Sequence, residues 1–146
     1  MFRGSYLAKI DERGRLRLPA RFRRDLPETA TVYVTSLDGI NAKIYPLPAW
    51  ERIEQKVREA PSMDASVQKL KNYSNYYGLE ADMDPQGRIL IHPKLREKVQ
   101  LKLNGDVTVI GNIDHFDICD DDEFRERLEA NPVTLDDTKR LTELGF

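Results

Sequence analysis

The sequence predicts an α+β fold, mainly β, in which two tandem copies of one unit close a single small barrel with helices around it. Three observations predict this fold: an internal repeat, an alternation of apolar and charged residues behind a glycine turn in each copy, and helical periodicity between and after the strand segments. The chain of 146 residues has room for one domain or two small units.

The repeat is the strongest of these signals. The segment Asp11 to Leu18 realigns with Asp84 to Ile91, 73 residues later, with identical Asp, Gly and Arg. An ordered series of further matches across both halves indicates two copies of one supersecondary unit. Such a unit buries little apolar surface alone, so the two copies should share one core. The further matches join Phe22-Arg23 to Leu95-Arg96, Thr31–Val34 to Asp106–Val109, Ile44 to Ile118 and Trp50 to Phe124.

Each unit begins with a strand, a turn and a second strand. In Arg15-Leu16-Arg17-Leu18 the alternation predicts a half-buried strand with its leucines inward and its arginines outward. The preceding Asp-x-x-Gly is typical of a turn, because Asp accepts backbone hydrogen bonds and Gly tolerates positive φ. Lys9-Ile10 and Met83 lead into the two turns as short strands, which predicts hairpin-like elements. Further strands are expected at Thr31–Val34, Lys43–Tyr45, Val107–Ile110 and Phe116–Cys119.

Helices are predicted from periodicity and from capping residues. Trp50, Ile53 and Val57 recur at helical spacing, and Asp64 and Thr134 can cap the helices that follow them. The expected helical segments are Ala20–Arg24, Ala49–Ala60, a helix from Asp64 to Gly78, Lys94–Val99, Asp121–Ala130 and a short helix ending near Leu144. The chain then divides into a first repeat with a helical pair (1–77), a second repeat (78–130) and an acidic C-terminal helical extension (131–146).

Charge is distributed unevenly along the chain. The 23 basic and 25 acidic residues give a net charge of −2, which excludes a uniformly basic coat. Residues 1–24 carry eight basic and two acidic side chains, whereas residues 114–146 carry four basic and eleven acidic ones. This polarity indicates a positive face for an anionic partner and an acidic tail directed elsewhere. The alternative is two solvated surfaces that attract neighbouring copies in an oligomer.

Several function classes find no support in the sequence. The single cysteine, Cys119, excludes an internal disulfide and a Cys-pair zinc site, and its apolar strand pattern favours a structural thiol. His92 and His115 lack the spacing of metal ligands, and the acidic run 120–122 suits a helix start better than a calcium loop. We therefore expect no enzyme activity, cofactor, metal or small-molecule substrate. With no apolar run near 18 residues and no signal-peptide h-region, we expect a soluble cytoplasmic protein without membrane contact.

Four motifs resemble one protein family. They are Met1-Phe2-Arg3-Gly4, Asp11-Glu12-Arg13-Gly14-Arg15, Asp84-Pro85-Gln86-Gly87-Arg88 and the Tyr45-Pro46…Trp50 stretch. Over about residues 1–130 the chain resembles the bacterial MraZ family. The resemblance implies tandem AbrB/MazE-like swapped-hairpin units in a pseudo-twofold double-split β-barrel. It also implies a sequence-specific, nucleoid-associated transcriptional regulator that forms a ring-shaped homo-oligomer. Such a regulator would bind direct repeats in double-stranded DNA near the promoter of the division and cell-wall gene cluster.

The arginines of the turns are the candidate DNA-binding residues. Arginine at a narrow two-stranded tip can contact phosphates and read guanine in the major groove, and Gly14 permits both the turn and a close backbone approach. The first copy should make the main contact, because Gln86 and Leu90 replace two of its arginines in the second; Leu90 is then expected to pack against a neighbour. The candidate residues are Arg13, Arg15, Arg17, Gly14, Arg3 and Arg88.

Other interpretations of these residues stay open. Arg15 and Arg88 could form ion pairs with Asp11 and Asp84 that only fix the shape of each turn. The arginines at 21, 23 and 24 are typical of a solvated helix face. The chain could also be an antitoxin-like interaction module of the same fold that binds a protein through its acidic C-terminus. Against this alternative, four apolar residues could form a packed amphipathic helix there, namely Leu135, Leu141, Leu144 and Phe146.

Overall fold

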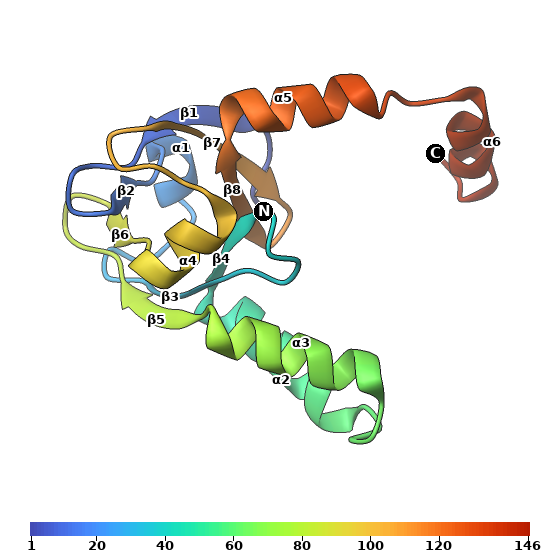
Figure 1. The fold of residues 1–146 in the computed structure, drawn as a ribbon, viewed down its shortest axis with the longest axis horizontal. Helices are drawn as coiled ribbons and strands as arrows, with labels where there is room; N and C mark the ends of the chain where they lie inside the picture. Colours follow the sequence, from blue (N-terminus) through green and yellow to red (C-terminus); the bar gives the residue numbers. More distant parts are fainter.

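A computed structural model describes all residues, 1–146. The strands are β1 (Ser5–Lys9), β2 (Arg15–Arg17), β3 (Thr31–Thr35), β4 (Ala42–Pro46), β5 (Leu79–Asp82), β6 (Arg88–Leu90), β7 (Asp106–Asn112) and β8 (His115–Asp120). The helices are α1 (Ala20–Arg23), α2 (Leu47–Glu59), α3 (Ala65–Tyr76), α4 (Pro93–Val99), α5 (Asp121–Ala130) and α6 (Leu135–Glu143). Figure 1 shows the strands gathered in one body with helices around it, which confirms the predicted α+β class.

The strands of the two repeats are interleaved. Six antiparallel strands form one sheet in the order β1-β7-β8-β4-β3-β5, and β2 pairs with β6 in a separate two-stranded ribbon. The predicted hairpins therefore pair mainly with the other repeat: β1 pairs with β7, and beyond the end of β1 the first turn is closed by a bridge between Ile10 and Leu16 and by a hydrogen bond from the Asp11 N–H to the Arg15 carbonyl. Each strand after a turn instead finds its partner in the other repeat. This exchange is compatible with the expected swapped-hairpin double-split barrel.

One core serves both repeats, as predicted. Leu16 of β2 and Ile89 of β6 face each other in the ribbon and are both fully buried. The ring of Phe116 lies 4.2 Å from that of Phe2 and 4.8 Å from that of Phe22, measured between centroids. Aromatic and aliphatic side chains from both halves thus pack into a single apolar cluster, which neither half could form alone.

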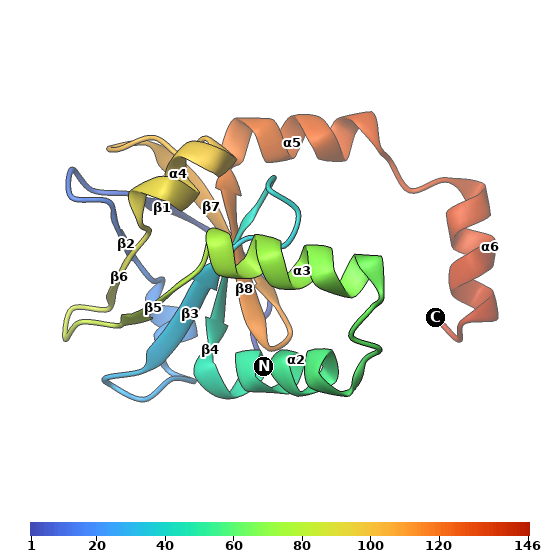
Figure 2. The same ribbon diagram turned by 60° about the horizontal axis from the view of Figure 1, so that its bottom comes forward.

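The helical pair α2 and α3 lies side by side next to β3 and β4 (Figure 2). Trp50 of α2 stacks on Tyr33 of β3 with ring centroids 4.5 Å apart. Asp64 caps α3 by accepting hydrogen bonds from the backbone N–H groups of Ser66 and Val67, which confirms the predicted cap.

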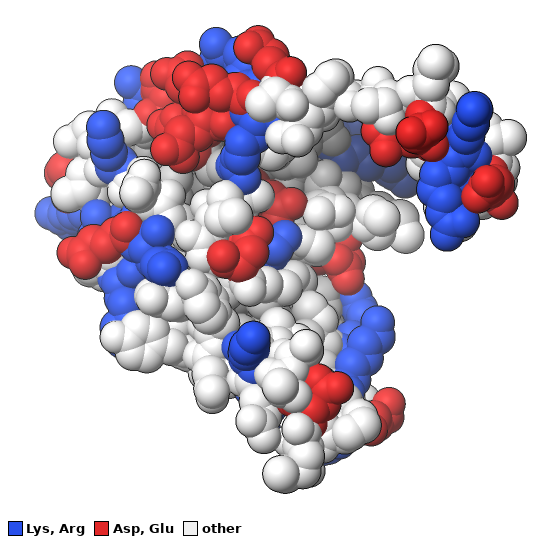
Figure 3. Space-filling model, turned by 45° about the vertical axis from the view of Figure 1, so that its right-hand side comes forward, with Lys and Arg blue, Asp and Glu red and all other residues white.

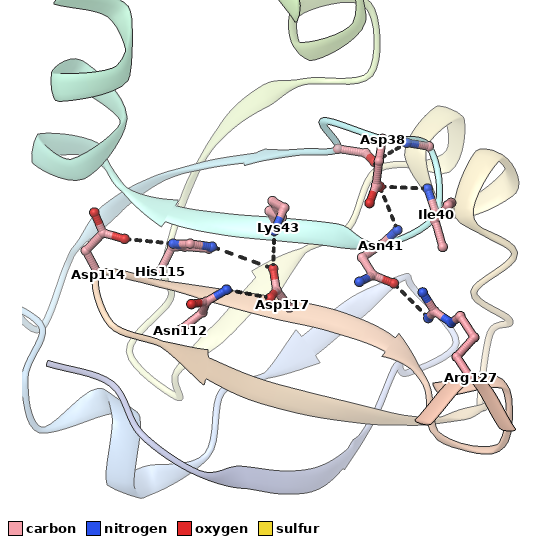
Figure 4. A network of polar contacts seen from close by, with 11 residues as sticks. Asp38, Ile40, Asn41, Lys43, Asn112, Asp114, His115, Asp117 and Arg127 are labelled. Atoms are coloured by element: carbon pink, nitrogen blue, oxygen red, sulfur yellow. Dashed lines mark hydrogen bonds and ion pairs between the residues drawn. The ribbon is translucent and has the colours of Figure 1, made fainter. Parts of the chain in front are cut away.

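A polar network joins the repeats on the sheet (Figure 4). Lys43 of β4 and Asp117 of β8 are direct cross-strand partners, and their charged atoms lie 2.6 Å apart in a largely buried position. Asn112 donates a second hydrogen bond to Asp117. Nearby, Arg127 donates to the side chain of Asn41, which fixes α5 against the loop between β3 and β4.

The C-terminal arm extends away from the body (Figure 1). Thr134 and Asp137 form the predicted capping box at the start of α6. The expected packing of this helix is not found within the chain, since Leu135 is 82% exposed and Phe146 is 87% exposed. The ten residues of α5 span about 15 Å and carry α6 off the sheet. No helix is both long enough and apolar enough to cross a membrane.

Candidate nucleic-acid interface

The first turn is organised by one carboxylate and one glycine. Asp11 Oδ1 accepts hydrogen bonds of 2.9 Å from the backbone N–H groups of Arg13 and Arg15. The Asp11 carbonyl accepts a third, of 3.0 Å, from the Gly14 N–H. Gly14 has a φ of +82°, which L side chains rarely adopt, so glycine is required here.

The second turn repeats this geometry. Asp84 Oδ1 accepts from the backbone N–H groups of Gln86 at 2.9 Å and Arg88 at 2.8 Å, and Gly87 has a φ of +77°. The hydrogen bond from the Arg15 N–H is the main reason that the pKa of Asp11 lies below its usual value. The N–H of Arg88 does the same for Asp84.

Arg15 and Arg88 each form an ion pair inside their own turn. Arg15 Nε lies 3.2 Å from Asp11 Oδ2, and Arg88 Nε lies 2.7 Å from Asp84 Oδ2. The structure thus contains the two ion pairs on which the alternative interpretation of these arginines depends. Both arginine side chains remain partly exposed, at 26% and 29%.

The outer face of the β2–β6 ribbon is cationic. Antiparallel pairing places Arg15 opposite Leu90 and Arg17 opposite Arg88, on the face away from the buried core. Like charges directly opposite each other are unfavourable, and only Arg88 of this pair has a carboxylate partner. Leu90 is 44% exposed beside these charges, and its expected packing against a neighbour stays a prediction.

Three of the candidate arginines are free of intramolecular partners. The side chains of Arg3, Arg13 and Arg17 are exposed and take part in no hydrogen bond or ion pair. Arg13 and Arg17 lie on the turn and the ribbon. Arg3 lies at the other end of β1, whose five residues span about 17 Å, so the structure does not bring it to the turn.

Two arginines near the turns have a position that the sequence did not reveal. Arg23 was expected on a solvated helix face; instead it is half-buried over Gly87, and its Nη1 donates to the Gln86 carbonyl at 3.3 Å. Arg96 lies over Gly14 in the same way. The space beside Gly14, which was expected to allow a close approach to DNA, is thus occupied by the Arg96 side chain. The sequence does contain a sign that the two arginines are equivalent, since each stands nine residues after the turn glycine of its own repeat.

Acidic side chains form a patch on the surface. In Figure 3 aspartates and glutamates gather at the top of the body, whereas lysines and arginines lie at its left edge and also elsewhere on this face. The acidic start of α5 accounts for part of the negative charge: Asp120 caps this helix, and three acidic residues occupy its first turn.

Cys119 and His92, which the turns do not involve, are both buried. Burial raises the pKa of the Cys119 thiol to about 12, as suits a structural thiol. His92 Nε2 donates to the Tyr77 carbonyl at 2.8 Å, and burial lowers the pKa of this histidine. No group of three or more His, Cys, Asp or Glu side chains is arranged to hold a metal ion.

Fold and site together define a class of protein with two interleaved swapped-hairpin repeats and a cationic two-stranded ribbon. Comparison with protein families finds a match over residues 1–72 and 79–142 to the family described as "MraZ protein, putative antitoxin-like". This chain belongs to the MraZ family, as its motifs indicated.

Curated relatives agree with this assignment over all or most of the chain. A protein named "Transcriptional regulator MraZ" from Acidobacterium capsulatum is 41% identical over 148 residues and covers 100% of both chains. One of the same name from Koribacter versatilis is 40% identical over 149 residues, again with full coverage of both. Another, from Pseudomonas aeruginosa, is 34% identical and covers 92% of this chain and 90% of its own.

Proposed function

We propose that this chain is a DNA-binding transcriptional regulator whose arginine-bearing turns and β2–β6 ribbon contact double-stranded DNA. The observation that carries the proposal is the outer face of the ribbon, where Arg17 stands opposite Arg88 with exposed Arg13 on the adjoining turn. An arriving phosphate or guanine edge would relieve the repulsion between the opposed guanidinium groups. The names of the relatives support a regulator of transcription.

The ribbon has dimensions that suit the major groove. Residues two apart on a strand are separated by about 7 Å, which is two base-pair steps of B-DNA, so Arg15 and Arg17 can address positions two base pairs apart. A two-stranded ribbon is narrow enough to enter this groove, where arginine binds guanine O6 and N7. Arg13 at the turn would then contact a phosphate, and Gly14 would hold the turn in shape.

The proposed oligomer, its DNA repeats and its target genes are based on the resemblance to the MraZ family. One ribbon offers few contacts, and a ring of copies would engage several direct repeats at once, so that weak affinities multiply. Repeats about 10–10.5 bp apart would present the same groove face to successive copies. We propose such repeats near the promoter of the division and cell-wall gene cluster, which places the protein on the nucleoid. Arg3, at the far end of β1, would contact a phosphate or a neighbouring copy.

The test is DNA affinity, measured by fluorescence anisotropy on the DNA upstream of the protein's own gene. The double variant Arg13→Ala/Arg17→Ala removes two side chains that have no intramolecular partner, so its fold should be intact. Lys139→Ala/Lys102→Ala, at two exposed lysines outside the ribbon and its turns, is the control with the same loss of charge. We expect the double variant to bind at least about tenfold more weakly, since each charge-assisted hydrogen bond contributes about 1.5–3 kcal/mol. Wild-type affinity in this variant would refute the proposal.

A second candidate function is favoured by the C-terminal arm. Leu135 of α6 and Phe146 just after it are exposed, which suits a protein partner, and the description of the matching family contains the words "putative antitoxin-like". Absence of DNA retention at low salt, together with a stoichiometric protein complex that Leu135→Ser and Phe146→Ser abolish, would establish this function instead.

A further inference from the structure

Each turn is completed by a guanidinium group from the other repeat. Arg96, on α4 of the second repeat, lies over Gly14 of the first: a Cβ atom on Gly14 would be 3.0 Å from Arg96 Nε and 3.3 Å from its Cζ. Arg23, on α1 of the first repeat, lies over Gly87 of the second, and a Cβ atom there would be 2.8 Å from Arg23 Nη1. The two glycines thus leave open the space that the ends of two arginine side chains fill.

Backbone hydrogen bonds follow the same exchange. The Gly14 carbonyl accepts from the Ile91 N–H at 2.8 Å, and the Gly87 carbonyl accepts from the Leu18 N–H at 2.8 Å. Arg96 Nε donates to the Ile91 carbonyl at 2.8 Å. Gly14, Ile91 and Arg96 therefore contact one another: Arg96 binds the Ile91 carbonyl, and the Ile91 N–H binds the carbonyl of Gly14 in the turn.

Ion pairing does not explain where these two arginines lie. Neither Arg23 nor Arg96 has a carboxylate within salt-bridge distance, and both are half-buried. The buried Nε of Arg23 has no hydrogen-bond partner. A partly buried cation without a counter-ion is unfavourable, so its placement over a glycine needs a compensating contribution. Packing of the planar group against the turn backbone, which a Cβ would prevent, supplies one.

We propose that Arg96 and Arg23 are positioning residues that hold the DNA-contacting turns across the repeats. Arg96 fixes the turn that carries Arg13 and Arg15, and Arg23 fixes the turn that carries Arg88. A substitution in the second repeat therefore weakens DNA contact by the first. This inference rests on the proposed function, and it adds that neither turn is fixed by its own repeat alone.

We call the contacts of Arg96 and Arg23 with the turn of the other repeat the brace. Amide hydrogen exchange tests the brace without DNA. In full-length Arg96→Ala we expect exchange at Gly14 to accelerate about fivefold, as loss of about 1 kcal/mol implies, while exchange at Gly87 stays unchanged. Arg23→Ala should give the opposite result: exchange should accelerate at Gly87 and stay unchanged at Gly14. Acceleration confined to the substituted repeat, or equal at both glycines, would overturn the proposal.

DNA affinity then tests whether the brace serves binding. Arg96→Lys keeps the charge but not the planar group, so we expect both Arg96→Lys and Arg96→Ala to bind about fivefold more weakly than wild type. Lys102→Ala, an exposed charge without an intramolecular partner, should stay within about twofold. The slope of log K against log salt should be unchanged in Arg96→Ala, because a positioning residue contacts no phosphate. Full rescue by lysine, or a shallower slope, would show a direct phosphate contact and refute the positioning role.

The two measurements separate the brace from the proposed function. Faster exchange at Gly14 in Arg96→Ala, in a wild-type protein that binds no DNA, would retain the brace and refute the DNA-binding proposal. Normal DNA binding by wild type, with no change of exchange or affinity in the Arg96 variants, would refute the brace alone. If Arg96→Ala does not fold, Arg96→Lys supplies both measurements.

Discussion

Three glycines with nearly equal backbone strain allow the contact between Arg23 and Gly87 to be measured. Gly4 and Gly14 have a φ of +82° and Gly87 of +77°, so alanine at each carries a similar conformational penalty of about 1–2 kcal/mol. Around a Cβ at Gly4 there is no atom within 4 Å, whereas at Gly14 the tightest contact is 3.0 Å. At Gly87 the Cβ would overlap the side chain of Arg23, which must move.

The expected loss of stability therefore rises in the order Gly4, Gly14, Gly87. Gly4→Ala should cost about 1–2 kcal/mol, and Gly87→Ala about 2–4 kcal/mol, since Arg23 also loses its hydrogen bond to Gln86 and its packing. Urea denaturation measures these values, and all variants are compared at one fixed protein concentration, because the stability of a protein that oligomerises depends on its concentration. The added cost at Gly87 should vanish in an Arg23→Ala background. Equal losses for Gly4→Ala and Gly87→Ala would refute the packing argument.

Three further outcomes follow from the core. Asp117→Ala should destabilise by about 3–5 kcal/mol in urea denaturation, because it leaves Lys43 largely buried without its partner, and Lys43→Met/Asp117→Leu should cost less than this single variant. Cys119 should react with a thiol reagent only as fast as the chain unfolds, since burial raises its pKa to about 12; rapid labelling under native conditions would contradict this. Burial lowers the pKa of His92, so the unfolded chain binds the proton first: stability should be full above about pH 6.5 and fall as pH drops through the folded pKa. A His92→Gln variant with the same pH slope as wild type would exclude that histidine as the cause.

Local signals allowed most elements to be predicted from the sequence. The cap at Asp64 and the capping box at Thr134 lie within four residues of the groups they bind, so their hydrogen bonds can be predicted from the local sequence. The alternation around Leu16 predicted both the strand and its buried face correctly. The periodic signals at 49–60 and 121–130 placed α2 and α5 within two residues of their ends.

Pairing between distant segments could not be predicted in the same way. The turn before Arg15 is compatible with a simple hairpin, and only the shared core requires β2 to pair with β6. For the same reason Arg23 was expected in solvent: the glycine beneath it lies 64 residues further along the chain, in the other repeat. The exposed apolar residues of α6 had a helical pattern in the sequence, but a pattern does not specify what the helix packs against.

The salt dependence of DNA binding tests the central claim most directly. The observed association constant for the DNA upstream of the gene should be measured between about 50 and 200 mM salt, for wild type and for Arg13→Ala/Arg17→Ala. With ribbon and turn as the contact surface, wild type should show a steep slope, and the variant should lose about 0.9 of slope for each phosphate contact removed. Equal slopes and equal affinities, with wild type and variant of the same particle mass in solution, would contradict the claim that these arginines bind DNA.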